Sequence, residues 1–589
     1  MIKNTTFNSR IYTQWFLASL AISGIFIALI KWFSFTNVYY NHFFDHGTLI
    51  IFYSIARVLF IGFIIWFIWS IGATLLRLVS PNAMLIVEIS PLDRFLLGFL
   101  VGTGILQIIL FAIGLAGLLN SSFIFLVTLF TLFLSGPHLY SIINKIPGAV
   151  KLLVTAKSFR SAATYAMLAV GIAIMALFIA TKGLYPAGGH DYYTHYFQYY
   201  LSVIRNESIL PNDVWYHFYY SKGAGLYFWG MLLTDPLAPQ LVTTSFIFVG
   251  ALIIYSLLSH AVGGRFLPWL GSILYVALLV YTPGPKENMV QGGWGDLEKV
   301  HEPAAVLFLS IVWITAQFEA ANLASRKVWL LALCSAIAAA SLFSTAVAFF
   351  IGAYLSLTTL WWLVKRNWVN VKAMLVACIV CAAAILIILY VNYFLTGLPL
   401  DQFILYFWSV SDLEKVNRWG ALNEVLVLHW ALTGYLANKV PLTWEIFPLV
   451  GKYLRLEIWW PVYILGFIAT AYSFQINRWK AFNRSTDYIM AFRSLSILFG
   501  MFVLFAIGLG AGRQQPISFY RFSSFMYGPM LCLGLLLCAL WPVNLRNRRK
   551  SRFYFCNDGI GSYWVGGQFP AIAYFPWAFR VRQSTRHSE

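Results

Sequence analysis

Long apolar runs constrain the fold of this chain more than any other feature of its sequence. A membrane-spanning helix needs about 20 apolar residues to cross about 30 Å of hydrocarbon. Runs of this length recur from residue 11 to residue 541, and few of them contain a charged side chain. They predict an all-α polytopic membrane protein with about 14 transmembrane helices. The predicted spans are 11–32, 48–72, 95–119, 122–138, 163–181, 237–259, 266–282, 303–321, 328–345, 346–364, 372–393, 458–475, 491–511 and 522–541.

The composition excludes the other broad classes. Only 10% of the residues are charged and 60% are apolar, whereas a soluble domain carries about 25% charged residues. A soluble domain, a disordered chain and a disulfide scaffold are all excluded. The first apolar run has the length of a span and lacks a small-residue cleavage site, so we expect an uncleaved span there. The region 328–364 is expected to be a hairpin of two spans that turns near Ser344.

Lysine and arginine residues predict the orientation. Placing the N-terminus inside puts most of the basic connectors on the cytoplasmic side, as the positive-inside rule requires. Both termini are then cytoplasmic. The formal net charge of +19 is explained by membrane orientation and gives no reason to expect a nucleic-acid partner.

Polar residues gather in the predicted outer connectors. These are the loops 182–236, 283–302, 394–457 and the short loop 512–521. Long loops in compact proteins usually carry function. The spans contain almost no carboxylates, whereas an ion-coupled transporter normally needs an acid near the middle of the membrane. The sequence therefore favours chemistry or binding at the outer surface.

The first outer loop is predicted to contain an interfacial amphipathic helix from Asp191 to about Arg205. Its aromatic face contains Tyr193, Phe197, Tyr200 and Ile204 at helical spacing. We expect this face to turn toward lipid, which anchors the loop at the headgroup level.

Ionisable side chains stand at the start of this predicted helix. Asp191 and His195 are four residues apart and share a helix surface, and His190 precedes them. Asp191 is either a helix N-cap, which favours Asp in any case, or a functional carboxylate. His195 is either a water-exposed interfacial residue or a functional one. Farther along the loop, Lys222 lies between aromatic and glycine residues. It either binds a phosphate or extends its charged end from the membrane interface into water.

The second outer loop ends with a further group of ionisable residues. Glu302 stands at the mouth of the next span with Pro303 after it, Glu298 lies one helical turn earlier, and His301 lies between them. Acids at a helix N-terminus also stabilise the helix dipole without any other role. These acids together with His195 and His301 would suit Mg²⁺ or Mn²⁺. Their spacing is not a metal signature, so a bound metal is left open.

The last outer loop contributes two arginines. Arg513 opens this loop, and Arg521-Phe522 closes it just before a proline-containing span. A guanidinium group suits phosphate oxygens. The alternative is an arginine that extends from the end of a span toward water.

The order of these motifs resembles the GT-C superfamily of membrane glycosyltransferases, and most closely the protein O-mannosyltransferase and aminoarabinose-transferase branch. That branch has an acidic residue followed by Tyr-Tyr in its first outer loop, and later a His-Lys-Pro-Pro-Leu-Tyr-type segment. This chain lacks those prolines and has one acid where many relatives have two. The matching segments are His190-Asp191-Tyr192-Tyr193 and Ser221-Lys222-Gly223-Ala224-Gly225-Leu226-Tyr227.

The resemblance implies a division of the chain and a location. It covers residues 163–541 as a GT-C-like catalytic transmembrane domain. Residues 1–162 are then an N-terminal accessory module of four spans, and residues 542–589 a basic cytoplasmic tail. The expected location is the plasma membrane, specifically a bacterial inner membrane, with the active site on the outer face.

The resemblance also implies a reaction. The donor would be a polyprenyl-phosphate sugar and the acceptor a glycan, a lipid or a protein. Asp191 would act as the general base, while Glu302 and His195 would orient the substrates. The group that would bind the donor phosphate is Lys222, Arg521 and Arg513.

Three alternatives remain. A lipid-linked glycan polymerase or ligase predicts a large arginine-rich outer loop, whereas these loops are mixed and slightly acidic. A lipid or solute transporter predicts charges along a transmembrane pathway, where Arg57 is nearly alone. A GT-C-like scaffold without catalytic activity is distinguished only by an activity measurement.

Overall fold

The computed structural model divides the chain into two compact units, Met1–Ala539 and Leu540–Glu589. Every residue described below belongs to the first unit. The structure describes residues 47–79, 89–143, 171, 174–175, 197–209, 224–234, 238–262, 266–281, 301–318, 321, 323–396, 493–495, 497 and 528–536.

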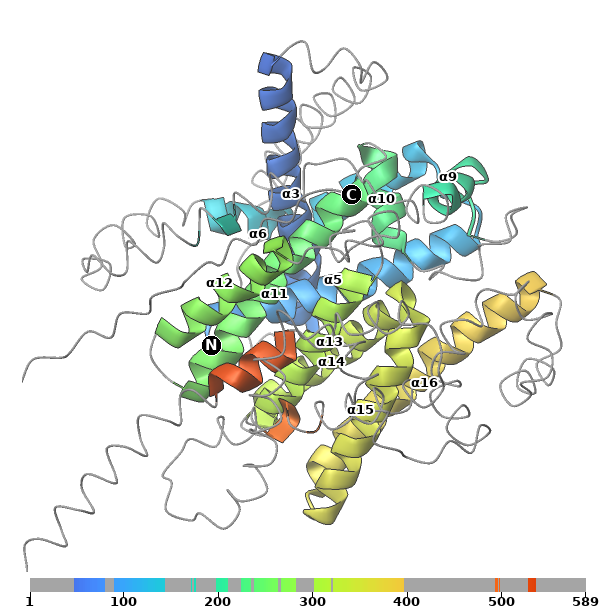
Figure 1. Cartoon of the computed structure of the whole chain (residues 1–589). Helices are drawn as coiled ribbons and strands as arrows, with labels where there is room; N and C mark the ends of the chain where they lie inside the picture. Colours follow the sequence, from blue (N-terminus) through green and yellow to red (C-terminus); the bar gives the residue numbers. More distant parts are fainter. Residues whose placement is uncertain are drawn as a thin grey trace, which may run out of the picture. The chain divides into compact units, whose positions relative to one another are not determined.

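Regular secondary structure in the described residues is entirely α-helical (Figure 1). Five helices contain stretches long and apolar enough to cross a membrane, and four shorter apolar helices accompany them in the same regions of the chain. The chain is therefore an all-helical protein with the helices of a membrane protein. The five stretches are Ile55–Val79, Pro91–Leu115, Ala238–Val262, Ser325–Phe343 and Trp368–Ile388.

Nine of the predicted spans each coincide with one described helix. The predicted turn near Ser344 is confirmed, because Ser344 has an extended backbone between two helices. The five other predicted spans lie wholly or mostly outside the described residues, so the total of 14 stays a prediction. The nine helices are α3 (Gly47–Val79), α5 (Pro91–Leu115), α6 (Ser121–Ile143), α11 (Ala238–Val262), α12 (Phe266–Tyr281), α13 (His301–Phe318), α14 (Leu323–Phe343), α15 (Thr345–Val364) and α16 (Trp368–Thr396).

Glycine residues allow α3 and α5 to pack with their backbones in contact. A Cβ atom added at Gly72 would lie 1.8 Å from the carbonyl oxygen of Gly98, and one added at Gly102 would lie 1.8 Å from that of Ile68. Gly98 and Gly102 form a small-xxx-small pattern, which is typical of helix pairs in membranes. A similar close contact of small residues occurs where Gly104 of α5 meets Ser335 of α14.

Contacts between side chains give the relative directions of neighbouring helices. Helices α3 and α5 run in opposite directions, because Gly72 meets Gly98 whereas Ile68 meets Gly102. Helices α11 and α13 run in the same direction, since Gly250 lies against Val306 and Ser256 bonds to Trp313. These directions are those expected if consecutive spans alternate across a membrane.

Two short helices come from the first predicted outer loop. They are α9 (Phe197–Arg205) and α10 (Gly225–Leu233), each of nine residues. All residues of α10 are buried, although the helix is too short to cross a membrane. Its Trp229 ring stacks on Phe67 at 5.1 Å between centroids and donates an indole hydrogen bond to Thr128. Helix α10 is therefore part of the protein interior.

Candidate functional site

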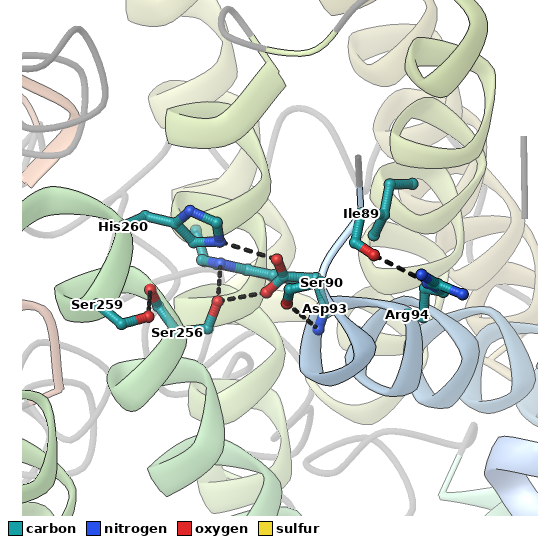
Figure 2. Close-up of polar contacts among 8 residues, drawn as sticks. Ile89, Ser90, Asp93, Arg94, Ser256, Ser259 and His260 are labelled. Carbon is teal, nitrogen blue, oxygen red and sulfur yellow. Dashed lines mark hydrogen bonds and ion pairs between the residues drawn. The ribbon is translucent and has the colours of Figure 1, made fainter. Parts of the chain in front are cut away.

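A buried carboxylate joins α5, α11 and α13. Asp93 is 2% exposed and lies in the first turn of α5. Its Oδ1 accepts a 2.5 Å hydrogen bond from the Ser256 hydroxyl, and its Oδ2 lies 2.8 Å from Nε2 of His260 (Figure 2). The Ser256 oxygen also accepts a 3.1 Å hydrogen bond from the Trp313 indole. We call Asp93, Ser256, His260 and Trp313 the Asp93 cluster.

The local sequence explains why α5 begins at this point. Ser90 is the N-cap residue, and its hydroxyl accepts a 3.1 Å hydrogen bond from the backbone N–H of Asp93. Pro91 occupies the first helical position, where the missing N–H costs nothing. Arg94 donates a 2.8 Å hydrogen bond to the carbonyl of Ile89, as Figure 2 shows. Because the helix starts two residues before Asp93, the carboxylate is fixed between helices.

The Asp93 cluster pairs a buried carboxylate with a partly exposed imidazole. A carboxylate removed from water is costly unless it is paired and hydrogen-bonded, and both oxygens of Asp93 have partners. The side chain of His260 remains 31% exposed, so its imidazole can exchange protons with water. Ser256 donates to the carboxylate and not to the imidazole, so these three residues do not form a nucleophilic triad.

A second structured region lies at the opposite end of α5. The backbone N–H of Ile209, just after α9, donates to the carbonyl of Gly114, and that of Leu119 donates to the carbonyl of Glu207. The backbone N–H of Leu226 in the first turn of α10 donates to the Gln107 side chain at 3.1 Å. Both loop helices are therefore bound to the last turns of α5 or to the turn that follows it.

The first turns of α9 and α10 contact each other through aromatic rings. Tyr200 lies 5.7 Å from Tyr227 and 5.8 Å from Phe228, and Tyr199 lies 6.0 Å from Phe228, measured between ring centroids. The Tyr227 hydroxyl lies 2.6 Å from that of Thr243 in α11. We call Tyr199, Tyr200, Tyr227 and Phe228 the loop aromatic cluster.

This arrangement differs from the prediction for the aromatic face of the first loop. That face was expected to turn toward lipid, but Tyr200 is fully buried against the rings of α10. The prediction is wrong for Tyr200. The physical reason is that the Tyr227 and Phe228 rings of α10 pack against Tyr200.

Glu302 is the one predicted catalytic residue whose side chain the structure describes. It lies half-buried in the first turn of α13, where its charge interacts with the Tyr275 hydroxyl of α12. Its acidic position at the helix start also favours the helix dipole. His301 begins the same helix.

The other predicted site residues lie outside the described residues. The structure therefore neither brings them together nor separates them. No group of three or more His, Cys, Asp or Glu side chains in the described part of the chain is placed to hold a metal ion. The remaining predicted residues are Asp191, His195, His190, Lys222, Arg513, Arg521 and Glu298.

Asp93 and His260 were not among the site residues predicted from the sequence. The span there was predicted to begin at residue 95, which left Asp93 in a connector, and the span before His260 was predicted to end at residue 259. A signal for Asp93 existed: Ser90-Pro91 is a typical helix start. It extends the helix backward and makes Asp93 a buried helical residue.

The fold and the Asp93 cluster define an all-helical protein of membrane type with ionisable groups buried between its helices. Comparison with models of known protein families, with curated proteins and with solved structures finds no match to this chain.

Proposed function

We propose that this protein is a membrane glycosyltransferase that moves a sugar from a polyprenyl-phosphate donor to an acceptor at the outer face of a membrane. The contact between the first turns of α9 and α10 supports this proposal most. His195 precedes α9 by two residues, and Lys222 precedes α10 by three. The loop aromatic cluster therefore joins the two helix starts that follow the candidate substrate-orienting residue and the candidate phosphate-binding residue.

The Asp93 cluster and the two loop helices lie at opposite ends of α5, which agrees with this proposal. The cluster lies at the first turn of α5, whereas the loop helices are bound near the last turn. In the predicted topology these ends face the cytoplasm and the outer side. The donor phosphate of a lipid-linked sugar lies at the headgroup level, where a loop docked onto span ends can reach it.

The proposed reaction is a single inverting displacement. An acceptor hydroxyl attacks the anomeric carbon while the bond from that carbon to the phosphate oxygen breaks. Asp191 takes the hydroxyl proton, and polyprenyl phosphate leaves as the anion. Lys222, Arg521 and Arg513 stabilise the charge that grows on the leaving phosphate, while Glu302 and His195 orient the substrates.

The test is sugar transfer by purified full-length protein from radiolabelled polyprenyl-phosphate sugars. Asp191→Asn should lower the rate at least about hundredfold, because a general base supplies about 10²–10⁴ in rate. Glu207→Gln is a matched control in the same loop, since Glu207 is exposed and hydrogen-bonds Asn120. Normal transfer by Asp191→Asn would contradict the assignment of the base. Absence of transfer by the wild type from every such donor would overturn the proposed function.

The Asp93 cluster favours a second candidate function, a proton-coupled transporter. Ionisable residues buried in membrane helices often mark proton pathways, and His260 combines partial exposure with contact to a buried acid. The position of Asp93 in a first helical turn favours a structural role at the end of a helix instead. Asp93 is therefore not an acid near the middle of a span, and the glycosyltransferase proposal retains more support.

Proton flux distinguishes the two candidates. Full-length protein is reconstituted into liposomes that contain a pH-sensitive dye. An imposed membrane potential then drives proton movement. A transporter should acidify or alkalinise the lumen faster than empty liposomes do, and Asp93→Asn should abolish the difference. A wild-type rate equal to that of empty liposomes would eliminate proton-driven transport by this pathway.

A further inference from the structure

The turn between α15 and α16 concentrates positive charge. Lys365 is the C-cap of α15, Arg366 follows it, and Lys372 lies in the second turn of α16; all three side chains are exposed. Figure 1 shows α15 and α16 as a pair of neighbouring helices joined at this turn. No carboxylate occurs anywhere from residue 320 to residue 400 of the sequence. The two helices therefore supply no carboxylate to balance these cations.

Two cations lie over one tryptophan ring at this turn. The Lys365 Nζ lies 5.2 Å from the centroid of Trp361, and the guanidinium of Arg493 lies 5.1 Å from it. Arg493 also lies 4.6 Å from the centroid of Trp362. All three distances are within the range at which aromatic rings attract cations. The two tryptophan rings therefore hold positive charge next to this turn.

The Trp361 ring also presents a hydrogen-bond donor. Its Nε1 is buried, and no described residue accepts its hydrogen. A buried donor without an acceptor costs free energy, so an acceptor from outside the protein would be stabilising. A phosphate offers both the negative charge and the acceptor oxygens that this group of donors requires.

The backbone at Arg366 gives a separate reason to expect a function for its side chain. Its φ angle is +54°, in the left-handed region where glycine is the usual residue at the end of a helix. The backbone N–H of Asn367 donates to the carbonyl of Trp362, and that of Arg366 donates to the carbonyl of Leu363, which closes the helix end. Arginine therefore occupies a position where its side chain does not help the turn.

Exposed apolar side chains flank the positive turn. Val364 is 72% exposed, Trp368 is 60% exposed and Val369 is 51% exposed. Cations beside exposed tryptophan and aliphatic groups are the arrangement found where helices meet lipid headgroups. The apolar groups suit acyl chains, whereas a free anion in water would make no use of them.

We propose that the α15–α16 turn binds the phosphate group of an anionic phospholipid. Lys365 and Arg366 contact the phosphate, Arg493 adds positive charge across Trp361, and the exposed apolar side chains lie against the acyl chains. The site is separate from the proposed glycosyltransferase site and holds whether or not that function is correct.

Lipid binding by purified full-length protein in neutral detergent tests this site. The probes are phosphatidylglycerol and phosphatidylcholine with identical acyl chains, and native mass spectrometry counts the lipid retained. The wild type should prefer phosphatidylglycerol. The double variant Lys365→Gln/Arg366→Gly should weaken phosphatidylglycerol binding on the order of twentyfold, because each interfacial cation contributes about fivefold. Phosphatidylcholine binding should not change.

Two further variants separate lipid binding at this turn from general effects on charge and folding. Arg77→Gln/Lys327→Gln also removes two exposed cations at helix ends, but from helices other than α15 and α16, and should change phosphatidylglycerol affinity by less than about twofold. Arg366→Gly alone relaxes the left-handed backbone, so it should fold at least as well as the wild type while losing about fivefold in affinity.

Three results would overturn the proposal. Equal affinity of the wild type for both lipids would show that the site does not require a negatively charged lipid. Unchanged phosphatidylglycerol binding by the Lys365→Gln/Arg366→Gly variant would place the lipid elsewhere. Complete displacement of phosphatidylglycerol by inorganic phosphate at millimolar concentration would assign the site to a free anion.

Discussion

At its first turn α5 is joined to α11 through one carboxylate, whereas near its last turn it meets α9 and α10 through backbone hydrogen bonds and a side-chain amide. At the first of these ends, Asp93 alone is the partner of two side chains of α11, and Trp313 of α13 bonds to one of them, Ser256. At the other end, Gln107 and Gly114 each bond to a backbone N–H of the loop, and aromatic rings fill the space beyond.

The difference concerns how each end responds to the loss of one group. A buried polar network fails as a unit, because the loss of its acceptor leaves several donors without partners. A ring cluster loses only the area and the bond that one side chain contributes. The same helix therefore combines a polar contact that depends on one residue with an aromatic contact that is shared among several.

The largest expected effect comes from Gly102→Leu, which acts on both ends. A Cβ atom at this position would lie 1.8 Å from the carbonyl oxygen of Ile68, and the obstacle is backbone that cannot rotate away. Separation of α3 from α5 should cost about 3 kcal/mol or more. We expect loss of monodisperse protein after detergent extraction and a marked fall in the midpoint of thermal unfolding.

Gly62→Leu is the matched control for that substitution. Gly62 lies in α3, the helix that packs against α5, but a Cβ atom there would have nothing within 4 Å. Its unfolding midpoint should stay close to that of the wild type. Equal damage from both substitutions would show that leucine in a helix, and not the contact of α3 with α5, is responsible.

Asp93→Ala should have the next largest effect. It removes the acceptor for the buried Ser256 hydroxyl and the partner of the partly exposed His260. Loss of one member of such a network should cost roughly 2–3 kcal/mol. The free energy of unfolding, measured by titration with sodium dodecyl sulfate, gives the value.

Asp93→Asn sharpens the same measurement. The amide oxygen still accepts from Ser256, so this variant should lose less than Asp93→Ala does. Glu207→Gln at the other end changes an exposed carboxylate and should stay within about 0.5 kcal/mol of the wild type. If Asp93→Ala were as stable as Glu207→Gln, the two ends of α5 would not differ as described.

The sequence predicts helices better than it predicts the contacts between them. The Ser344 hairpin was predictable because polar residues interrupt two apolar runs of span length. Helix α10 was not recognised as an interior element, because nine apolar residues are too few for a span and its partners are distant in sequence. The partner of Tyr200 was missed for the same reason.

The Asp93 cluster shows the corresponding limit for functional residues. Asp93 and Ser256 are 163 residues apart, and no local pattern indicates that the start of one helix meets the end of another. Glu302 was recognisable because its position before an apolar run is a local property of the sequence. Local helix starts are therefore predictable, whereas the pairing of distant side chains requires the packed structure.

The smallest effect is expected for Tyr227→Phe in the loop aromatic cluster. The substitution keeps the ring and its contact with Tyr200 but removes the hydroxyl that lies 2.6 Å from that of Thr243. One buried hydrogen bond should contribute about 1 kcal/mol. A double-mutant cycle with Thr243→Val isolates this interaction, since the coupling should account for most of the loss.

Tyr255→Phe serves as a control, because it keeps the ring contact with Trp269. A loss from Tyr227→Phe as large as that from Asp93→Ala would mean that this end of α5 also depends on one polar group.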